Sequence, residues 1–479
     1  YIVGRVTRQP GEGPEGQAGG SAPAARWLAL AAVSGAWVPY GLAVAEFLRY
    51  ETLSVTVGSI SLAMDGIGLL LAGLSLTLGT LVVLFSGRYL AGEDGEEKFY
   101  AMLVAMIGVM IGLGTATDLF NLWVWFEAMA VTSYLLVSFY RYNGLALEAG
   151  VKYLVQSATG SMLVLVGIAL VLMQTGTLNL SEIRLVAQPT ASLIMAGALF
   201  IVGFGVKAAL VPLHTWLPDA HSQAPSGISA MLSGVVIEAG LVAMLRALSG
   251  IAVMSEGWGA MLIAFGTLNM LVGNLMALRQ RQVKRMLAYS SLTHIGYMLL
   301  GLGIAINTGI IAGAQGGLFH MLNHGLMKGL AFLAAGVLLW VLHLAGTDHS
   351  ALLVEDLSGA GRRYPLVSVA LSIAVLGLAG LPPLAGFMSK WQIFVAGFES
   401  GNGLLMATVV FAALMSVLSL GYYAPLVNVT YRKVPSSVVA RGPDIPILMQ
   451  APLALLAVAV LAIGLWPSLL TWLTAPAAR

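Results

Sequence analysis

Long apolar runs separated by short polar stretches follow one another along almost the whole chain. The runs cover residues 27–48, 62–86, 99–117, 119–140, 150–173, 191–213, 225–247, 257–278, 286–305, 308–343, 366–398, 404–430 and 447–473. A transmembrane helix needs about 20 apolar residues, whereas a strand of a membrane barrel needs about 10. The pattern therefore predicts thirteen membrane-spanning helices. We expect residues 1–3 to end an earlier helix, so that the thirteen runs are helices two to fourteen.

The composition agrees with a polytopic all-α membrane protein. Of the 479 residues, 58% are hydrophobic and only 9% are charged, which is more apolar surface than a water-soluble protein can bury. The net charge of +2 gives no indication of a nucleic-acid surface. The chain contains no cysteine, which excludes disulfides, thiolate zinc sites and cysteine-ligated iron–sulfur clusters from it.

The basic residues divide unequally among the predicted loops. Fifteen of the 23 lysines and arginines, Lys284 among them, follow odd-numbered helices, four follow even-numbered helices, and four lie inside apolar runs. Loops rich in Lys and Arg stay on the cytoplasmic side of a membrane. We therefore predict that the loops after odd-numbered helices are cytoplasmic and that the carboxyl terminus is outside. The expected location is a prokaryotic-type inner (cell) membrane.

Some ionisable side chains fall inside the apolar runs, where a charge costs about 2.5–3.5 kcal/mol on insertion scales. Glu127 is far from both ends of its run, and its side chain is too short to reach the interface. Lys207 is close enough to the cytoplasmic end of its run that its amino group could reach water. Glu127 could therefore pair with a buried cation for structure, and Lys207 could extend to the interface. Alternatively, both take part in proton transfer, because a lysine whose acidic partner comes and goes can bind and release a proton.

Two runs contain prolines that should interrupt a helix. Pro212 follows Lys207, and the pair Pro382–Pro383 precedes Lys390. Proline removes a backbone donor, and a broken helix persists in a membrane only where protein or water satisfies the freed groups. In transporters such breaks lie at binding sites near the bilayer midplane. We expect both breaks to mark functional regions and the chain to contain two related halves.

Histidines and further charges supply more candidates. His320, His324 and Lys328 are spaced at i, i+4 and i+8 and so share one helix face. The two histidines could bind a metal, form a structural pair or line a hydrated proton path. His294 could extend that path or only fill space in the core. Lys152 lies near the start of a helix, where it could take part in proton transfer or only anchor the helix at the interface.

Three more ionisable residues are expected near the membrane surfaces. His214 and His221 flank the segment "TWLPDA" and are predicted at the membrane edge, where zinc binding is the alternative. Asp65 lies near the outer end of its run and is a weak candidate for function.

The segments "FGVKAALVPLHTWLPDAH", "RQVKRMLAYSSLTHIGYMLLG", "HMLNHGLMKGLAFLAAG" and "LPPLAGFMSK" resemble the antiporter-like membrane subunits of the respiratory complex I superfamily. This superfamily includes the large subunits of Mrp-type antiporters, NADH–quinone oxidoreductase and membrane-bound hydrogenases. The resemblance covers residues 61–431. The stretch "MQTGTLNL" at residues 173–180 is most similar to the D-type Mrp subunit and its hydrogenase relatives.

The resemblance implies a fourteen-helix fold with discontinuous helices seven and twelve. Two inverted five-helix repeats would occupy residues 99–248 (helices four to eight) and 257–430 (helices nine to thirteen). Residues 1–98 would hold the N-terminal helices and a Gly/Pro-rich loop, and residues 447–479 the C-terminal helix.

The resemblance also implies roles for individual residues. Glu127 and Lys207 are similar to the charge pair of the first half-channel, and Lys390 to the lysine of the second. His294, His320, His324 and Lys328 are similar to the central hydrated axis. Glu238 departs from the family pattern, which usually has lysine or histidine there. An acid at this position could bind a proton or favour a cation such as Na⁺.

We therefore predict a proton-translocating membrane subunit of a multi-subunit complex, coupled to a redox module, with Na⁺/H⁺ antiport as a variant of the same transport. Redox chemistry is not expected in this chain, so flavin and iron–sulfur clusters would belong to partner subunits. Expected partners are other membrane subunits, a peripheral redox arm, the lipid bilayer and H⁺, with Na⁺ as a further ion if the subunit is an antiporter. The alternatives are a redox-independent Mrp-type Na⁺/H⁺ antiporter subunit and a membrane scaffold that conducts nothing.

Overall fold

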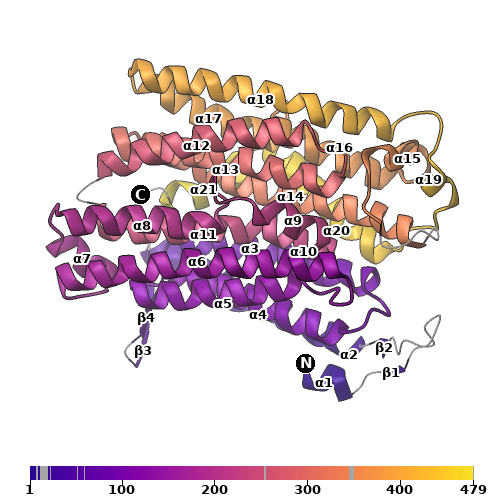
Figure 1. Ribbon diagram of the computed structural model, residues 1–479, viewed down its shortest axis with the longest axis horizontal. Helices are drawn as coiled ribbons and strands as arrows, with labels where there is room; N and C mark the ends of the chain where they lie inside the picture. The colour runs from indigo at the N-terminus through magenta and orange to yellow at the C-terminus, as the bar shows by residue number, and fades with distance from the viewer. Residues whose placement is uncertain are drawn as a thin grey trace.

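The computed structural model describes residues 1–6, 9–10, 20–21, 23–50, 52–58, 60–252, 255–344 and 350–477. The main helices lie roughly parallel along the long axis of the molecule (Figure 1). Most of the predicted Gly/Pro-rich loop is outside the described residues.

Eleven helical segments within the described residues are long and apolar enough to cross a membrane. Ten of them are α2 (Pro23–Tyr50), α3 (Gly66–Tyr89), α4 (Glu96–Thr115), α5 (Leu119–Val137), α6 (Gly144–Thr175), α12 (Ser255–Ala277), α13 (Val283–Thr308), α14 (Ile311–Leu344), α18 (Gly403–Thr430) and α20 (Ile447–Leu465). The eleventh is the continuous segment α10 (Ser226–Met231), η1 (Leu232–Val236) and α11 (Ile237–Gly250). The chain is therefore an integral membrane protein, as its sequence predicts.

The two remaining apolar runs are interrupted where their prolines predict. The first forms α8 (Ala191–Lys207), after which the chain turns irregularly before α9 (Trp216–Gln223). The second forms α16 (Pro365–Ala379) and α17 (Ala385–Glu399). Both helix breaks are confirmed, whereas the division into inverted repeats stays a prediction.

The other elements are short and lie near the ends of the long helices. They are α1 (Ile2–Val6), β1 (Gln9–Pro10), β2 (Gly20–Ser21), β3 (Leu53–Val57), β4 (Ile60–Met64), α7 (Leu180–Val186), η3 (Val354–Leu357), α15 (Ala360–Arg363), α19 (Ser437–Arg441) and α21 (Ser468–Ala477). The expected helix at residues 1–3 thus corresponds to one short helix, α1.

Two predicted boundaries are wrong. The run at 62–86 begins in a hairpin, because β4 pairs antiparallel with β3 in a register that places Val55 opposite Leu62. Helix α3 begins only after Asp65, whose side chain accepts a hydrogen bond from the Gly68 backbone N–H at 2.8 Å and so caps the helix. The run at 447–473 is divided at residues 466–467, where α20 ends before α21. Apolar composition alone distinguishes neither a strand from a helix nor one helix from two.

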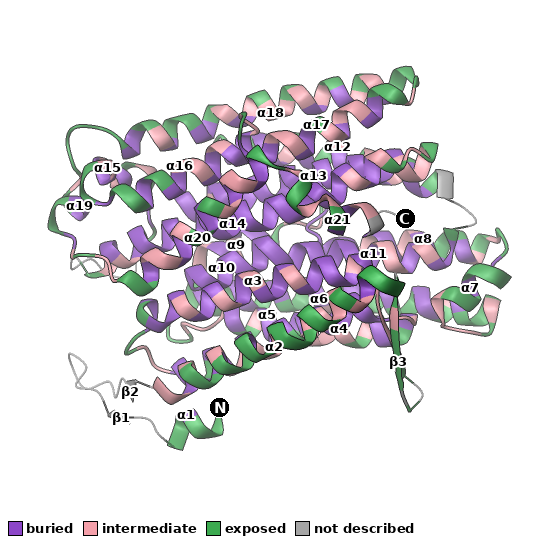
Figure 2. Ribbon diagram, turned by 180° about the vertical axis from the view of Figure 1, so that it is seen from behind, coloured by how far each residue is buried: buried purple, intermediate pink, exposed green. Residues whose placement is uncertain are grey.

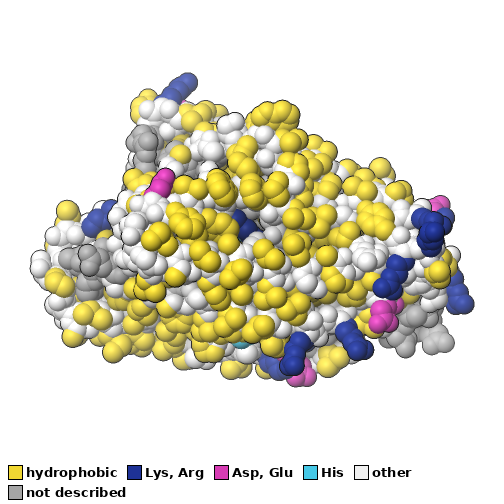
Figure 3. Space-filling view, turned by 90° about the horizontal axis from the view of Figure 1, so that it is seen from above, with side chains coloured by type: hydrophobic (Ala, Val, Ile, Leu, Met, Phe, Trp, Pro, Cys, Tyr) yellow, Lys and Arg dark blue, Asp and Glu magenta, His cyan; other side chains and the backbone are white. Residues whose placement is uncertain are grey.

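Burial separates a central group of helices from a peripheral one. The apolar windows of α14 and of the α10–α11 segment are 94% buried, whereas those of α2 and α18 are 11% and 22% buried (Figure 2). The exposed side chains of the peripheral helices are largely apolar, as expected for a surface that contacts lipid. In Figure 3 the middle of one face is mainly hydrophobic, and basic side chains gather at the end that carries α15 and α19 in Figure 1.

Candidate functional site

Lys207 ends α8 and is buried among aromatic and hydroxyl groups of α6 and α9. Its Nζ donates hydrogen bonds to Tyr153 Oη at 2.8 Å and to Ser157 Oγ at 3.4 Å. The Tyr153 ring stacks on Trp216 with centroids 3.9 Å apart, and the Trp216 indole donates to the Val206 carbonyl at 2.8 Å. The stacked pair therefore links the Lys207 amino group, through Tyr153, to Trp216 on the far side of the helix break.

The break after Lys207 is satisfied by one side chain of α12. Asn269 Oδ1 accepts a hydrogen bond from the Val211 backbone N–H at 2.8 Å, and Asn269 Nδ2 donates to the Ala209 carbonyl at 3.1 Å. Ala209 has φ 54°, in the left-handed region that non-glycine residues rarely adopt. Protein groups thus replace the helical hydrogen bonds that this segment lacks, which is the condition for irregular backbone inside a membrane.

Glu127 lies on α5 and is half-buried. The sequence predicts a charge pair with Lys207, but the salt bridges found within the described part of the chain do not include one between these residues. Glu127 Oε1 is instead buried with no hydrogen-bond partner among the described residues. The ring of its neighbour Phe126 lies 5.9 Å from the lysine nitrogen, so the two elements meet, in the described ranges, without a salt bridge between the two charged groups.

The second lysine at a break, Lys390 on α17, has an environment similar to that of Lys207. It is buried, and its Nζ donates to the Leu378 carbonyl and to Ser416 Oγ, each at 2.8 Å. The Tyr297 ring lies 4.6 Å from the nitrogen. Each broken helix therefore places one lysine against a hydroxyl group and an aromatic ring.

A row of buried hydrogen bonds fills the region between these lysines. Glu238 Oε1 and His324 Nδ1 are 2.7 Å apart, and both side chains are fully buried. A hydrogen bond of 2.9 Å joins His294 Nδ1 to His320 Nε2, and another of 2.9 Å joins His320 Nδ1 to Ser389 Oγ. The rings of His294 and His324 have centroids 5.1 Å apart. The structure thus joins the three histidines, which the sequence groups in one predicted path, to Glu238, which departs from the family pattern.

Lys328 lies one helical turn beyond His324 on α14. Its Nζ donates to the Leu287 carbonyl at 2.7 Å and also to Ser290 Oγ. Ser291 in the same turn of α13 shares a hydrogen bond of 2.7 Å with Ser233. Hydroxyl groups therefore line this side of the buried row.

The position of Glu238 depends on a close approach between two helices. Glu238 follows the π-helical turn η1, a feature frequent at functional sites. Within η1, a Cβ added to Gly234 would lie 2.9 Å from the carbonyl oxygen of Gly325 on α14. Only glycine at these positions allows the backbones to come close enough for Glu238 to reach His324.

Comparison with known proteins assigns this arrangement to a family. The sequence profile described as "NADH:quinone oxidoreductase/Mrp antiporter, TM" matches residues 116–416, which is more than half of the chain. The chain belongs to this family. The family contains both oxidoreductase and Mrp subunits by its description, so it confirms the superfamily that the motifs indicate.

Relatives in the NADH:quinone oxidoreductase/Mrp antiporter family match almost the full length. F(420)H(2) dehydrogenase subunit N of Methanosarcina mazei is 34% identical over 436 residues, 88% of this chain and 85% of the relative. NADH-quinone oxidoreductase subunit N of Chloroflexus aggregans is 33% identical over 440 residues, 89% of this chain and 87% of the relative. Both are named as N subunits, so the likeness to a D-type Mrp subunit stays a prediction.

A solved structure of the same architecture comes from an archaeal respiratory membrane complex, the membrane-bound sulfane sulfur reductase. It superposes with a TM-score of 0.82 at 30% identity, covering 95% of this chain and 91% of the other. The predicted antiporter-like fold is therefore confirmed.

Two buried residues within the family motifs have surroundings that the sequence does not predict. The sequence places Lys284 in a cytoplasmic loop, yet it lies in the first turn of α13, where it is buried and donates to the Ala224 carbonyl. His221, predicted at the membrane edge, is fully buried and stacks on Phe332 with centroids 4.6 Å apart. Neither ring nitrogen of His221 has a hydrogen-bond partner among the described residues. His221 lies in the segment "DAH" and Lys284 in "VKR", and both segments belong to the family motifs. Membership of those motifs is the sequence feature that could have marked the two residues as functional candidates.

The surface candidates lie apart from the buried row. Lys152 is 47% exposed and forms salt bridges with Glu148 at 2.7 Å and Asp219 at 3.1 Å. His214 is half-buried, and its ring faces that of Tyr289 edge-on with centroids 6.4 Å apart. In the part of the chain that the structure describes, no group of three His, Asp or Glu side chains is arranged to hold a metal ion.

Asp65, a weak candidate in the sequence, has a structural contact. Its carboxylate accepts a hydrogen bond from Arg246 at 2.7 Å, and Arg246 also donates to the Gly114 carbonyl. The contact ties α3 and α4 to α11 near one membrane surface.

Proposed function

We propose that this chain is a proton-translocating membrane subunit of a multi-subunit complex. The main support is the buried row Glu238–His324 and His294–His320–Ser389 beside two lysines at helix breaks. Ionisable groups are expensive inside a membrane and are usually functional there. Membership of a family whose relatives are named as subunits of quinone-linked and F(420)H(2)-linked dehydrogenases supports the same function.

In this proposal the two lysines at the helix breaks bind and release the transported proton. A change in the charge or position of Glu127 alters how strongly Lys207 holds its proton, because a nearby carboxylate favours the charged form of a lysine. The proton then passes along the histidines, each of which has one nitrogen that donates and one that accepts. It leaves near Lys390 on the outer side, which requires the predicted orientation with the carboxyl terminus outside.

The energy source lies in other subunits in this proposal. The chain has no cysteine to hold an iron–sulfur cluster, and flavin and iron–sulfur clusters would belong to a partner redox arm. Optical and EPR spectra of the native complex, extracted in mild detergent, test this point. Flavin or iron–sulfur signals that co-purify with the chain support a redox-driven pump, and their absence from an intact complex contradicts it.

Na⁺/H⁺ antiport without redox chemistry is the second candidate. The observation that favours it is Glu238, whose Oε2 is buried with no hydrogen-bond partner among the described residues. A central carboxylate oxygen of this kind suits a hard cation such as Na⁺. A scaffold that conducts nothing is disfavoured, because it gives no reason to keep Lys207, Lys328 and Lys390 buried at the cost of desolvation.

The deciding experiment measures proton movement by the complex reconstituted in vesicles. Lys207→Ala should abolish coupled proton translocation while redox turnover by the partner subunits continues. Lys152→Ala is the matched control, since Lys152 is exposed and paired at the surface. Unchanged translocation in Lys207→Ala would refute the proposal, and Na⁺ dependence of translocation in the wild type would favour antiport.

A further inference from the structure

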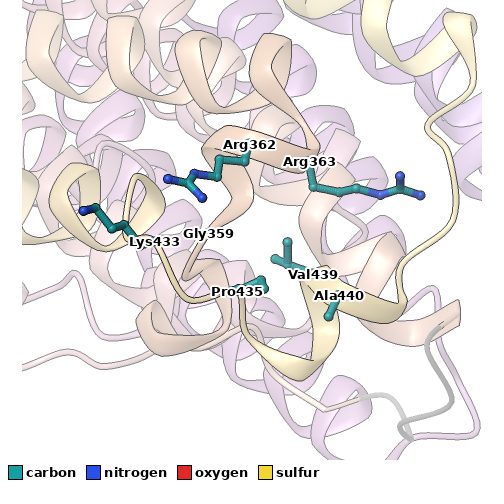
Figure 4. A pocket seen from close by; sticks show the side chains of 7 residues that line it. All are labelled: Gly359, Arg362, Arg363, Lys433, Pro435, Val439 and Ala440. Carbon is teal, nitrogen blue, oxygen red and sulfur yellow. The ribbon is translucent and has the colours of Figure 1, made fainter.

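A hollow of about 470 Å³ opens between two loops at the end of the molecule that carries α15 and α19 (Figures 1 and 4). It is lined by Gly359, Arg362, Arg363, Lys433, Pro435, Val439 and Ala440. None of these residues belongs to the buried row of the ion-translocation proposal. Three of the seven carry a positive charge, and none carries a negative one.

The walls of the hollow are fixed by contacts between the two loops. Ser358 Oγ donates to the Val434 carbonyl at 2.7 Å, and the Ser436 backbone N–H donates to the Ser358 carbonyl at 2.9 Å. Gly359 has φ 78°, and a Cβ added there would lie 2.5 Å from the Pro435 Cα. Only glycine allows the two loops to come this close, so the hollow is formed by the protein itself without a ligand.

The three cations differ in how far they are already neutralised. Arg363 donates to Asp444 at 3.1 Å and extends away from Arg362 and Lys433 (Figure 4). Arg362 and Lys433 extend toward the same side of the hollow, and neither has a carboxylate partner in the described ranges. One nearby acid, Asp356, uses its carboxylate to accept the Leu353 backbone N–H at 2.8 Å. The hollow therefore presents two uncompensated positive charges to an anion.

The position of the hollow relative to the membrane indicates the source of the anion. Helix α16 begins at Pro365 and α18 ends at Thr430, so Arg362 and Arg363 directly precede one apolar helix and Lys433 directly follows another. Lys and Arg just beyond transmembrane helices lie at the level of the lipid headgroups. The charged hollow is thus placed at the height of phosphate groups in the adjacent leaflet.

Exposed apolar side chains stand on the two helices beside the hollow. Tyr431 is 47% exposed, lies against Gly361, and its hydroxyl is 3.3 Å from Ser372 Oγ on α16. Val369, on the same helix, is also 47% exposed. Exposed apolar side chains beside paired cations match a molecule with an anionic head and apolar tails rather than a small soluble anion.

We propose that this hollow binds the phosphate group of an anionic phospholipid between Arg362 and Lys433, with the acyl chains along Tyr431 and Val369. Juxtamembrane cations each strengthen attraction to anionic lipid by roughly fivefold. Removal of both cations should therefore weaken binding by roughly 25-fold. The prediction concerns lipid binding alone and is independent of ion translocation.

Native mass spectrometry of the purified complex, titrated with phosphatidylglycerol, measures this binding directly. The test variant is Arg362→Gln with Lys433→Gln. The matched control is Arg279→Gln with Arg281→Gln, which removes two exposed cations from another loop. We expect the test variant to lose about 25-fold in affinity, the control to bind as the wild type does, and phosphatidylcholine to bind all three equally weakly.

Several outcomes would overturn the proposal. Equal losses in the test and control variants would mean general attraction to a basic surface without a specific site. Displacement of the lipid by inorganic phosphate would identify a soluble anion as the ligand. If no lipid binds to the wild type because a neighbouring subunit covers the hollow, the hollow is a protein interface. Ala440→Trp, which fills the hollow without changing its charge, should also reduce binding, and unchanged binding there would contradict the assigned place.

Discussion

Gly325→Ala tests whether helix approach, rather than the ionisable residues alone, creates the buried row. A Cβ at this position would lie 2.6 Å from the Gly234 carbonyl oxygen, and carbon–oxygen contacts between helices are normally about 3.3 Å or longer. The backbones must therefore separate by about 0.7 Å. Applied to the 2.7 Å contact between Glu238 and His324, this shift gives about 3.4 Å, beyond a normal hydrogen bond.

The expected loss of stability has two parts. Insertion of a methyl group into a packed core costs about 1–3 kcal/mol. A buried hydrogen bond to a charged group is worth about 1.5–3 kcal/mol. The free energy of unfolding of Gly325→Ala should therefore be lower by about 2.5–6 kcal/mol, and proton translocation should fall with it because the row is interrupted at Glu238.

Unfolding of the purified complex in detergent and proton uptake by vesicles supply the two measurements. Gly108→Ala is the matched control: it lies inside α4, and a Cβ added there meets nothing within 4 Å. This control should be neutral or more stable by up to about 1 kcal/mol, since alanine favours helix. If Gly325→Ala unfolds and translocates like Gly108→Ala, the close approach does not position Glu238 and the reasoning is wrong.

Three further outcomes follow from contacts elsewhere. Asp65→Ala removes a helix cap and a salt bridge and should lower the free energy of unfolding by about 1–3 kcal/mol, whereas Glu46→Ala, from an exposed pair, should change thermal unfolding little. Asn269→Leu leaves two backbone groups at the α8 break without a partner, so it should lower the free energy of unfolding by about 2–5 kcal/mol. It should also accelerate hydrogen exchange of the Val211 amide, and unchanged exchange would contradict the role given to Asn269. Lys152→Gln should change stability by less than about 1 kcal/mol and leave translocation intact, and a loss of translocation would place Lys152 in the path.

Local sequence signals predicted the parts of the fold that depend on local chemistry. Length and apolarity of the runs predicted the spans, because each helix must satisfy its own backbone in lipid. Pro212 and Pro382–Pro383 predicted the breaks for the same reason. The predicted helix boundaries are wrong at residues 62–64 and 466–467. At both places an apolar run continues through a strand or a turn, and apolar composition does not distinguish these from a helix.

Individual burial was harder to predict than the spans. The sequence places Lys284 in a loop because the nearest apolar runs end at residue 278 and begin at residue 286. In the folded chain the Ala224 carbonyl, which follows α9, covers its amino group. Nothing near Lys284 in the sequence specifies that contact, because the partner comes from a segment 60 residues away.

The sequence by itself determined that this protein spans a membrane, that two of its helices are broken, and that certain ionisable residues lie at membrane depth. Only the tertiary structure decided which of them meet: Glu238 with His324, and His294 with His320 and Ser389. It also gave the Lys207 amino group hydrogen bonds to Tyr153 and Ser157 instead of a salt bridge with Glu127. Hydrophobicity and helix breaking act within a few residues of the chain. Contacts between side chains depend on how closely two helices approach. Gly234 and Gly325, on opposite sides of one interface, allow that approach, although they are far apart in the sequence.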